Sequence, residues 1–366
     1  MKSLAIQIRG VSYKPVDLHD TLDASSVILL RANNIDDGKI NFDEVVFVDK
    51  KKVSQEQLLQ KGDVLICASS GSKYLVGKAA TVDFDREVTF GAFCKVVRPR
   101  NQEDADYISM YFQSPIYRRE ISSVAIGANI NNIRNEHIDA LSVRWPSAEK
   151  RQDSSSILRK VDLIIRRRKL ELQVFDKLIK ARFVEMFGDL KLNPYGWELR
   201  SFEDMSELIT DGEHATPRRV SKGIYLLSAR NVLNHSLQLN DVDYIDQEEY
   251  DRIAKRIIPR EGDVLISCSG TVGRCCSVPC GLKFQMVRSA ALIRFKDCLN
   301  PVFVEYMITS DFLQDQINSS KTASSQANLF QGKIAKLKGF VPPIELQIQF
   351  VDFVKQVDKS KSLTAL

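Results

Sequence analysis

The most regular hydrophobic pattern in the chain lies near its middle. From about Ala148 to Phe187 there is neither glycine nor proline, and apolar residues recur every three or four positions. This spacing predicts one helix of about 40 residues with an apolar stripe, about 60 Å long at 1.5 Å per residue. Intervals of 11 residues along the stripe favour a nearly straight helix over a tightly supercoiled one. Gly188 ends the predicted helix.

A second, shorter helix of the same kind is predicted from Ile344 to Leu366, directly after a pair of prolines. An amphipathic helix that recurs after each half of the chain favours a helix pair over an ordinary core helix. Any part of the longer helix that the shorter one leaves uncovered would be available to another subunit or to a second copy. The predicted helix-pair or partner interface consists of Ile157, Val161, Ile164, Leu172, Phe175, Ile179, Phe183, Ile348, Val351 and Val357.

The regions that precede these two helices are copies of one unit. The run Gly62–Ile66 recurs without change as Gly262–Ile266, and Leu29–Asn34 is similar to Leu226–Asn231. A third match begins at Asn132, at an offset of 196. Because the three matches follow in the same order, they indicate a duplicated unit with loop insertions.

Within each copy, short apolar runs between turn residues predict strands. These include Glu44–Val48, Val64–Ile66, Val264–Ile266 and Ala290–Phe295, and a helix is predicted over Pro301–Ile317. The fold class is therefore α+β, with two tandem β-rich domains joined by long helices. We place the first domain at 1–147, the connector helix at 148–192, the second domain at 193–343 and the shortened second helix at 344–366.

Composition supports two folded domains. The chain has 366 residues, of which 44% are hydrophobic and 27% are charged, as in ordinary globular proteins. It contains no run of about 20 apolar residues that would span a membrane. Charged residues interrupt the first positions before a signal peptide could form, so we expect a cytoplasmic protein with seven reduced cysteines.

The net charge of +5 is concentrated in one segment. The connector at 148–192 holds 12 Lys or Arg against 7 Asp or Glu, an excess equal to that of the whole chain. The rest of the chain is neutral in sum. If the two domains bind a charged partner such as DNA, local contacts from loops, rather than bulk charge, would therefore determine which sequence they prefer.

Motifs for catalysis are absent. The chain has no G-x-x-x-x-G-K-[ST] loop for nucleotide hydrolysis. Asn193–Gly196 superficially resembles the motif of amino-methyltransferases, but it lacks the second proline and follows a helix, which favours a turn. The cluster of Cys268, Cys275, Cys276 and Cys280 lacks the paired spacing of zinc ligands, so small reduced residues are favoured over a metal site and no metal is expected.

The loops beside the repeated strands are rich in side chains that bind DNA. Arg and Lys bond to guanine edges and phosphates, Asn pairs with adenine, and Ser and Thr bond to either. Singly, each is more often a solvated surface residue. The candidates are Arg31, Asn33, Asn34, Lys73, Tyr74, Lys78, Arg98, Arg100 and Arg118 in the first half, and Thr216, Arg218, Arg219, Arg230, Asn231, Ser269, Thr271, Arg274, Lys283 and Arg288 in the second.

Four segments together resemble the specificity subunit of type I restriction-modification systems. They are Leu29–Ile35, Gly62–Ile66, Gly262–Gly273 and Val341–Gln347, and the resemblance covers nearly the whole chain. It implies two target-recognition domains, each recognising half of a split sequence in double-stranded DNA. It also implies that the long helices pair as an antiparallel coiled coil, which sets the separation of the domains to about one DNA turn, ~34 Å.

The resemblance further implies a non-catalytic chain. Two adenine-methylating modification subunits would dock on the helices, and motor-nuclease restriction subunits would join for cleavage. S-adenosylmethionine, ATP and Mg²⁺ would act in those partners, with no cofactor in this chain. The alternative is a protein–protein adaptor that oligomerises through its helices. A stand-alone enzyme has the least support, because no set of base, nucleophile or metal ligands repeats between the halves.

Overall fold

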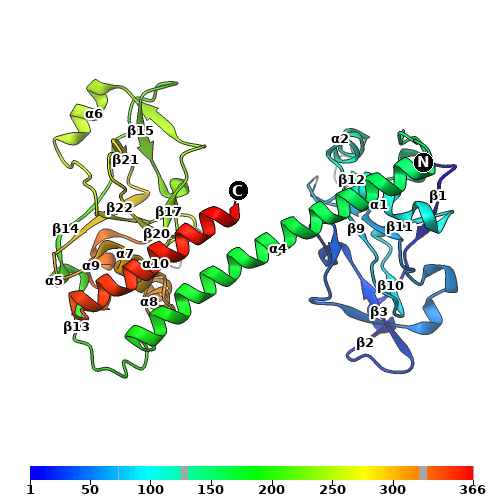
Figure 1. Ribbon diagram of the computed structural model, residues 1–366, viewed down its shortest axis with the longest axis horizontal. Helices are drawn as coiled ribbons and strands as arrows, with labels where there is room; N and C mark the ends of the chain where they lie inside the picture. Colours follow the sequence, from blue (N-terminus) through cyan, green and yellow to red (C-terminus); the bar gives the residue numbers. More distant parts are fainter. Residues whose placement is uncertain (73, 125–130, 321–327, 366) are drawn as a thin grey trace. The chain divides into compact units, whose positions relative to one another are not determined.

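The computed structural model of the protein describes residues 1–72, 74–124, 131–320 and 328–365 (Figure 1). The chain forms two compact units, Met1–Ile165 and Arg166–Leu366. The boundary between them lies inside helix α4, which spans Ala148–Phe187 as the hydrophobic pattern predicts. Both units mix helix and sheet, which confirms the α+β class. The finer domain bounds at 147, 192 and 343 stay predictions.

The first unit contains two four-stranded sheets with the orders β1-β11-β7-β9 and β10-β3-β6-β2. The first sheet is antiparallel, whereas β10 and β3 in the second run parallel. The elements are β1 Ala5–Arg9, β2 Leu18–His19, β3 Ser26–Leu30, β4 Ile35–Asp36, β5 Lys39–Ile40, β6 Val46–Asp49, β7 Val64–Cys67, β8 Ser69–Ser70, β9 Ala79–Thr81, β10 Val88–Phe90, β11 Cys94–Pro99, α1 Ala105–Gln113, α2 Pro115–Val124, β12 Asn131–Asn132 and α3 Asn135–Asp139.

The second unit repeats this topology. Its sheets have the orders β14-β22-β19-β20 and β18-β15-β21, and β15 runs parallel to β21 as β3 does to β10. The elements are β13 Leu199–Ser201, α5 Phe202–Met205, β14 Ser206–Asp211, β15 Ile224–Leu227, β16 Val232–Leu233, β17 Ser236–Leu237, β18 Asp243–Ile245, α6 Gln247–Ala254, β19 Val264–Ser267, β20 Cys275–Ser277, β21 Phe284–Met286, β22 Ala290–Phe295, α7 Pro301–Thr309, α8 Asp311–Ser320, α9 Gln331–Ala335, β23 Lys338–Phe340 and α10 Ile344–Ala365.

The repeated Gly-Asp turn is fixed by a buried ion pair in each unit. Asp63 is 1% exposed and accepts two hydrogen bonds from the guanidinium of Arg98, at 2.8 and 2.7 Å. Asp263 is equally buried and accepts two from Arg294, both at 2.8 Å. Each carboxylate also accepts a backbone N–H three residues before it. The turn therefore positions the following strand, β7 or β19, which is buried throughout.

Two predicted elements differ from the structure. The strand predicted from Glu44 begins only at Val46, because Glu44 has a left-handed backbone with φ of 50°. The helix predicted over Pro301–Ile317 is divided into α7 and α8 at Ser310. Ser310 is extended, and its hydroxyl bonds to the carbonyl of Met307 at 2.6 Å. This side-chain bond competes with continuation of the helix.

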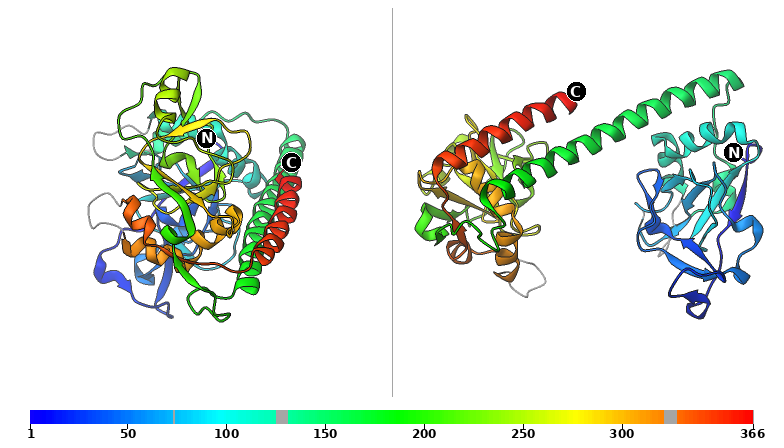
Figure 2. Two further views of the ribbon diagram at one scale, coloured as in Figure 1. Left: turned by 90° about the vertical axis from the view of Figure 1, so that its left-hand side faces the viewer. Right: turned by 60° about the horizontal axis from the view of Figure 1, so that its bottom comes forward.

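Helix α10 lies along the C-terminal part of α4 (Figures 1 and 2). The ring centroids of Phe183 and Phe350 are 5.4 Å apart, and Lys361 Nζ lies 2.9 Å from Asp176 Oδ1. The later residue of α4 thus contacts the earlier residue of α10, so the two segments run in opposite directions. Ile179 is also buried in the core of the second unit. Among the described residues, no helix is both long and apolar enough to span a membrane.

Candidate nucleic-acid interface

In the first unit, four loops meet where β3 and β7 end. Gly91 donates its N–H to the carbonyl of Leu30, and Ala68 donates to the carbonyl of Phe93, both at 2.9 Å. Val11 donates to Phe90 at 2.8 Å. These backbone bonds join the loop after β3, the loop after β7, the β10–β11 turn and the end of β1. We call residues 10–11, 31–34, 68–72, 74–78 and 91–93 loop edge 1.

The second unit has the same arrangement. Val287 donates its N–H to the carbonyl of Leu227 at 2.9 Å, and Cys268 donates to that of Ser289 at 2.8 Å. Glu213 donates to Met286 at 2.8 Å. The bonds join the loops after β15 and β19, the β21–β22 turn and the end of β14. We call residues 212–213, 228–231, 268–274 and 287–289 loop edge 2.

Six of the nine candidates from the first half lie on loop edge 1 or brace it, one of which, Asn34, is described below. Asn33 and Tyr74 are exposed, and Arg31 and Lys78 are half-buried. Arg118 extends from α2 and donates to the carbonyls of Tyr74 and Val76, so it supports the loop after β7. Candidate Lys73 lies outside the described residues. Whether any of these side chains contacts a base stays a prediction.

Arg98 is corrected, and Arg100 lies outside loop edge 1. The side chain of Arg98 is 13% exposed and is committed to Asp63 and to the carbonyl of Leu58. Loop edge 1 adjoins the N-terminal end of β11. Arg98 and Arg100 lie at the C-terminal end of this strand. The burial of Arg98 reflects the need to pair a buried carboxylate.

The two candidate asparagines are corrected as well. Asn34 and Asn231 are fully buried. The Asn34 amide donates to the carbonyl of Asp43 at 2.8 Å, and that of Asn231 donates to the carbonyls of Gln238 and Asp241 at 2.9 and 2.8 Å. Because both side chains are buried and bonded to loop carbonyls, they shape the loops and are not exposed to a DNA base.

Loop edge 2 contains most of the remaining candidates. Arg230, Thr271 and Arg288 are exposed, and Ser269 is half-buried. The Arg274 guanidinium donates to the carbonyl of Ala229 at 3.3 Å, so it links two of the loops. Lys283 lies outside loop edge 2, because it precedes β21 and bonds to Gln247, at the opposite end of that strand from the β21–β22 turn. Whether it contacts DNA stays a prediction.

Three candidate arginines of the second unit are already paired with carboxylates. Arg218 lies 2.8 Å from Asp246 and 2.7 Å from Glu248, and these acids raise its pKa. Arg219 and Arg230 both contact Asp243, at 3.0 and 3.1 Å. Thr216 is exposed in the same segment between β14 and β15. The arginines are among the residues predicted from the sequence, whereas the acids paired with them are not.

Phe93 is a further residue that the sequence analysis missed. Its ring is 70% exposed in the β10–β11 turn, at the centre of loop edge 1. The repeat offset of 196 aligns it with Ser289 of loop edge 2, whose hydroxyl accepts the Ala229 N–H. Extending the repeat alignment through this turn would have found both residues.

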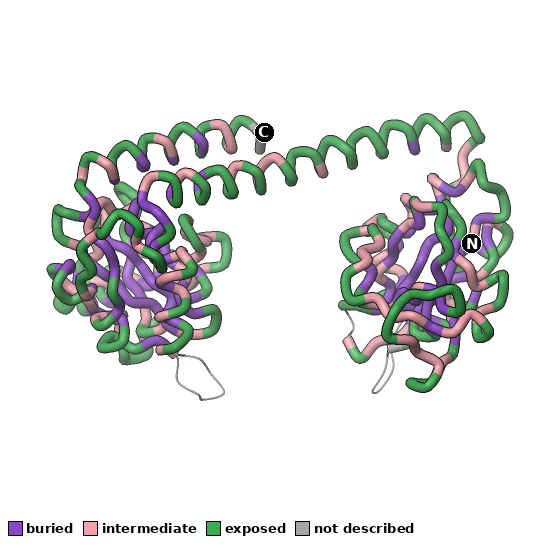
Figure 3. Tube along the Cα trace, turned by 90° about the horizontal axis from the view of Figure 1, so that it is seen from below, coloured by how far each residue is buried: buried purple, intermediate pink, exposed green. Residues whose placement is uncertain are grey.

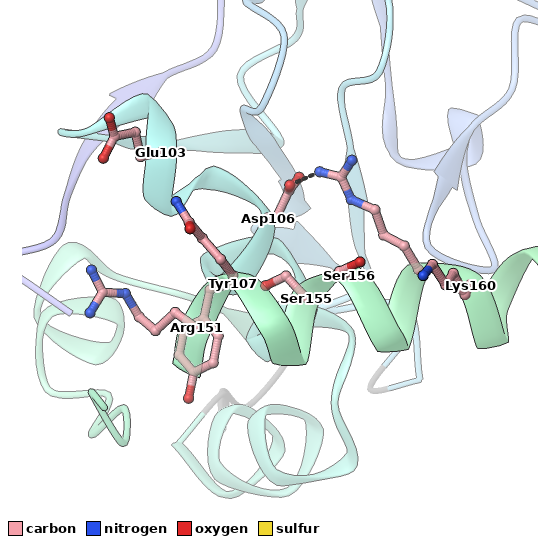
Figure 4. A pocket seen from close by; sticks show the side chains of 9 residues that line it. Glu103, Asp106, Tyr107, Arg151, Ser155, Ser156 and Lys160 are labelled. Atoms are coloured by element: carbon pink, nitrogen blue, oxygen red, sulfur yellow. Dashed lines mark ion pairs between the residues drawn. The ribbon is translucent and has the colours of Figure 1, made fainter. Parts of the chain in front are cut away.

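A separate hollow of about 440 Å³ lies in the first unit, between α1 and the beginning of α4 (Figure 4). Arg151 on its wall bonds to Asp104, and Arg159 pairs with Asp106. These ion pairs fasten the first turns of α4 to the first unit. None of the residues that line the hollow belongs to loop edge 1. Among the residues that the structure describes, no group of three or more His, Cys, Asp or Glu side chains could hold a metal.

The predicted helix interface divides into two parts (Figure 3). Ile179, Phe183 and Val357 are buried in the core of the second unit. Val351 is also buried, and Leu172 and Phe175 are half-buried. By contrast, Ile157, Val161 and Ile164 are 60%, 45% and 58% exposed. Ile348 is 46% exposed, because Phe350 and Val354 occupy the covered face of α10. It lies outside the helix pair, and its contact with a partner stays a prediction.

Comparison with known sequences gives one family. The profile of the type I restriction modification DNA specificity domain matches residues 29–174 and 194–365, most of the chain and both copies of the repeat. The chain belongs to this family. Membership confirms the resemblance that the repeated motifs indicate. It makes the chain a non-catalytic subunit for DNA sequence recognition, with DNA and other restriction-modification subunits as its partners.

Two relatives of the family are specificity subunits. The type I restriction enzyme EcoKI specificity subunit of Escherichia coli (strain K12) is 28% identical over 371 residues, covering 96% of this chain and 79% of that protein. The StySPI specificity subunit of Salmonella potsdam is 41% identical over 140 residues, covering 38% of this chain and 30% of that protein. These relatives do not favour the adaptor hypothesis.

The fold of the family has a solved counterpart. The crystal structure of the type I restriction-modification S subunit from M. genitalium superposes with a TM-score of 0.57. That alignment is 12% identical and covers 99% of this chain and 89% of the other. At this identity the likeness concerns the fold alone.

Proposed function

We propose that each unit recognises one half of a bipartite DNA sequence through its own loop edge. The observation that supports this is the duplication of the loop edge itself: the same four loops meet through equivalent backbone bonds in both units. Exposed loops on a rigid sheet can present side chains to base edges, while their backbone bonds limit the entropy lost on binding. Two such edges in one chain fit a target with two specified parts.

The test is reconstitution with adenine-methylating modification subunits, followed by sequencing of methylated bases. We expect two short specified sequences separated by an unspecified spacer of fixed length. A continuous, ungapped target would overturn the proposal. Replacing 269–274 with the corresponding loop of another family member should change only one half-site. The matched exchange around Lys73 should change the other, with methylation retained in both cases.

We propose that α4 and α10 act as an antiparallel coiled coil that sets the spacing of the half-sites. The contacts of Phe183 with Phe350 and of Asp176 with Lys361 support this pairing. The apolar stripe continues beyond α10 toward the start of α4, where Val161 is 45% exposed. We propose that the two modification subunits dock there.

Two glutamate variants test this docking. Val161→Glu should abolish copurification with the modification subunits, because a charge would be desolvated in an apolar interface. Leu170→Glu is the control: Leu170 is 59% exposed and lies nine residues away, on the opposite face of the helix. Equal loss in both variants, or in neither, would contradict docking on the stripe.

Cofactors belong to the partners in this proposal. S-adenosylmethionine would serve the modification subunits, and ATP and Mg²⁺ would serve the motor-nuclease subunits. The DNA substrate places the proposed site of action in the cytoplasm. We expect no methyl transfer when the chain is incubated with S-adenosylmethionine and DNA alone, and methyl transfer once the modification subunits are added.

A further inference from the structure

Two arginines from separate segments of the second unit converge on one carboxylate. Arg219 Nε lies 3.0 Å from Asp243 Oδ2, and Arg230 Nη2 lies 3.1 Å from Asp243 Oδ1. The side chains of Arg219, Arg230 and Asp243 are 45%, 47% and 33% exposed. The group is therefore open to a large ligand, although each guanidinium already has a fixed partner. We call these three residues the Asp243 triad.

The backbone fixes all three members of the triad. Asp243 begins β18 and faces Leu226 near the end of β15, the strand that leads into the loop of Arg230. The segment of Arg219 is joined to β18 by a 2.9 Å bond from Val220 N–H to the Tyr244 carbonyl. The triad thus adjoins loop edge 2.

The first unit has different residues at the equivalent positions. With the repeat offset of 197, Arg230 corresponds to Asn33 and Asp243 corresponds to Val46. The surrounding scaffold is retained, because Asn34 and Asn231 have the same burial and the same loop-closing role. The triad is therefore not needed to build this fold, which has a copy without it in the same chain.

A carboxylate has two physical effects on arginines that face DNA. It orients the planar guanidinium while leaving further N–H groups for a base edge, since an arginine has five donors and the pair uses one or two. The carboxylate also neutralises positive charge that would otherwise bind any phosphate. Its own negative charge repels the phosphates of non-specific DNA. Both effects favour the correct base sequence over random DNA.

Resting on the proposed function, we propose that Asp243 is a specificity-determining residue for the half-site that the second unit recognises. It orients Arg219 and Arg230 for base contacts and prevents them from binding phosphates non-specifically. The inference concerns one half-site only, because the first unit has Val46 at this position.

The test uses the chain reconstituted with modification subunits and three duplexes. One contains the mapped target, one has the second unit's half-site scrambled, and one has the other half-site scrambled. In Asp243→Asn, we expect discrimination against the second scrambled half-site to fall about tenfold, the scale of one bidentate base contact. Binding to random duplex should strengthen. The plot of the logarithm of the binding constant against the logarithm of salt concentration should become steeper by about 1 to 2. Discrimination at the first half-site should not change.

Asp241→Asn is the matched control. Asp241 is 81% exposed and lies 3.9 Å from Arg230. Its replacement changes the net charge as much as Asp243→Asn does, but it leaves Asp243 in contact with both arginines. We expect its discrimination to stay within about twofold of the wild type, since exposed pairs contribute little. If the two variants lose discrimination equally, bulk charge explains the effect and the inference is overturned.

Asp243→Glu separates charge from geometry. It keeps the negative charge but moves the carboxylate by one methylene, so we expect random-duplex binding to stay weak while discrimination falls. Unchanged discrimination in both Asp243 variants overturns the inference, with folding checked by thermal unfolding. If the wild-type complex itself fails to discriminate at the second half-site, the proposed bipartite recognition is wrong instead.

Discussion

At the loop edge of the first unit, Asn33 is exposed and the facing strand begins with Val46; the second unit has Arg230 and Asp243 at these two positions. One residue further, Asn34 and Asn231 are identical, fully buried and bonded to the same kind of loop carbonyls. The two copies thus retain the side chains that close each loop and differ in those that the loop presents. A duplicated recognition unit can change its target without losing its scaffold in this way.

The comparison extends to the Gly-Asp turns. Asp63 and Asp263 are each paired with an arginine about thirty residues later, in β11 or β22. The hairpins β4–β5 and β16–β17 differ between the units. Gly38 in the first hairpin corresponds to His235 in the second, and both residues have left-handed backbones. The predictions below test which of these positions are shared scaffold and which belong to one unit.

The largest effect is expected from the buried carboxylates. Asp63→Ala and Asp263→Ala should each lower the free energy of unfolding of their own unit by about 3–5 kcal/mol, because an arginine is left without its buried partner. Denaturant unfolding with limited proteolysis would measure the loss and locate it. Asp241→Ala, at an exposed carboxylate, should change stability by less than about 0.5 kcal/mol. A loss in only one unit would contradict a shared scaffold.

A smaller loss is expected at the loop-closing amides. Asn34→Ala and Asn231→Ala should each lower the free energy of unfolding by about 1–3 kcal/mol, since the partly buried loop carbonyls lose their donors. Asn231 should be the more sensitive, because it donates to two loop carbonyls within 3 Å. Denaturation curves of the two variants test the order, with Asn33→Ala as the exposed neighbour that should change little.

Substitutions in the hairpin should affect the stability of the two units differently. His235 Nδ1 lies 2.9 Å from Glu305 Oε2, whose carboxylate is almost fully buried. His235→Asn keeps a residue that tolerates the left-handed backbone but loses this bond, so we expect a loss of about 1–2 kcal/mol. Gly38→Asn introduces the same side chain at the equivalent position and should cost less than about 1 kcal/mol. Thermal unfolding compares them, and equal losses would show that the His–Glu pair is without effect.

The smallest effect on stability is expected from modification of the exposed cysteines. Burial raises the pKa of Cys268 and Cys276 to about 12 and raises that of Cys67, so few of these thiols are thiolates at pH 8. Iodoacetamide should therefore label only the exposed Cys280 and Cys298 in the folded chain. Mass spectrometry after brief labelling gives the sites. Labelling of the buried thiols at the same rate would mean that both cores open readily.

Much of the architecture follows from local pattern. The 40-residue helix α4 matches the region without glycine or proline, and the repeated Gly-Asp-Val-Leu-Ile runs form equivalent buried strands. These elements are predictable because hydrophobic spacing and turn residues act over a few positions. The loops that hold the exposed candidates Asn33, Tyr74, Arg230 and Thr271 are predictable for the same reason, since each residue lies within a few positions of a repeated strand.

The errors arose where a partner lies far away in the chain. Arg98 looked like a surface residue, yet it meets Asp63, which is 35 positions earlier, because β11 and β7 are antiparallel neighbours. Lys283 lies outside loop edge 2, at the other end of β21, for the same reason of strand direction. No local pattern indicates which end of a strand faces a binding surface, or which arginine a buried carboxylate will need.

The sequence by itself determined the duplication, the long helix, the family and the loops that bear the differences between the two copies. Only the tertiary structure decided which polar side chains those loops expose, that Asn34 and Asn231 turn inward, and that Arg219 and Arg230 share Asp243. The physical reason is that periodicity and turn chemistry are local, whereas desolvation and charge pairing depend on strand order and direction.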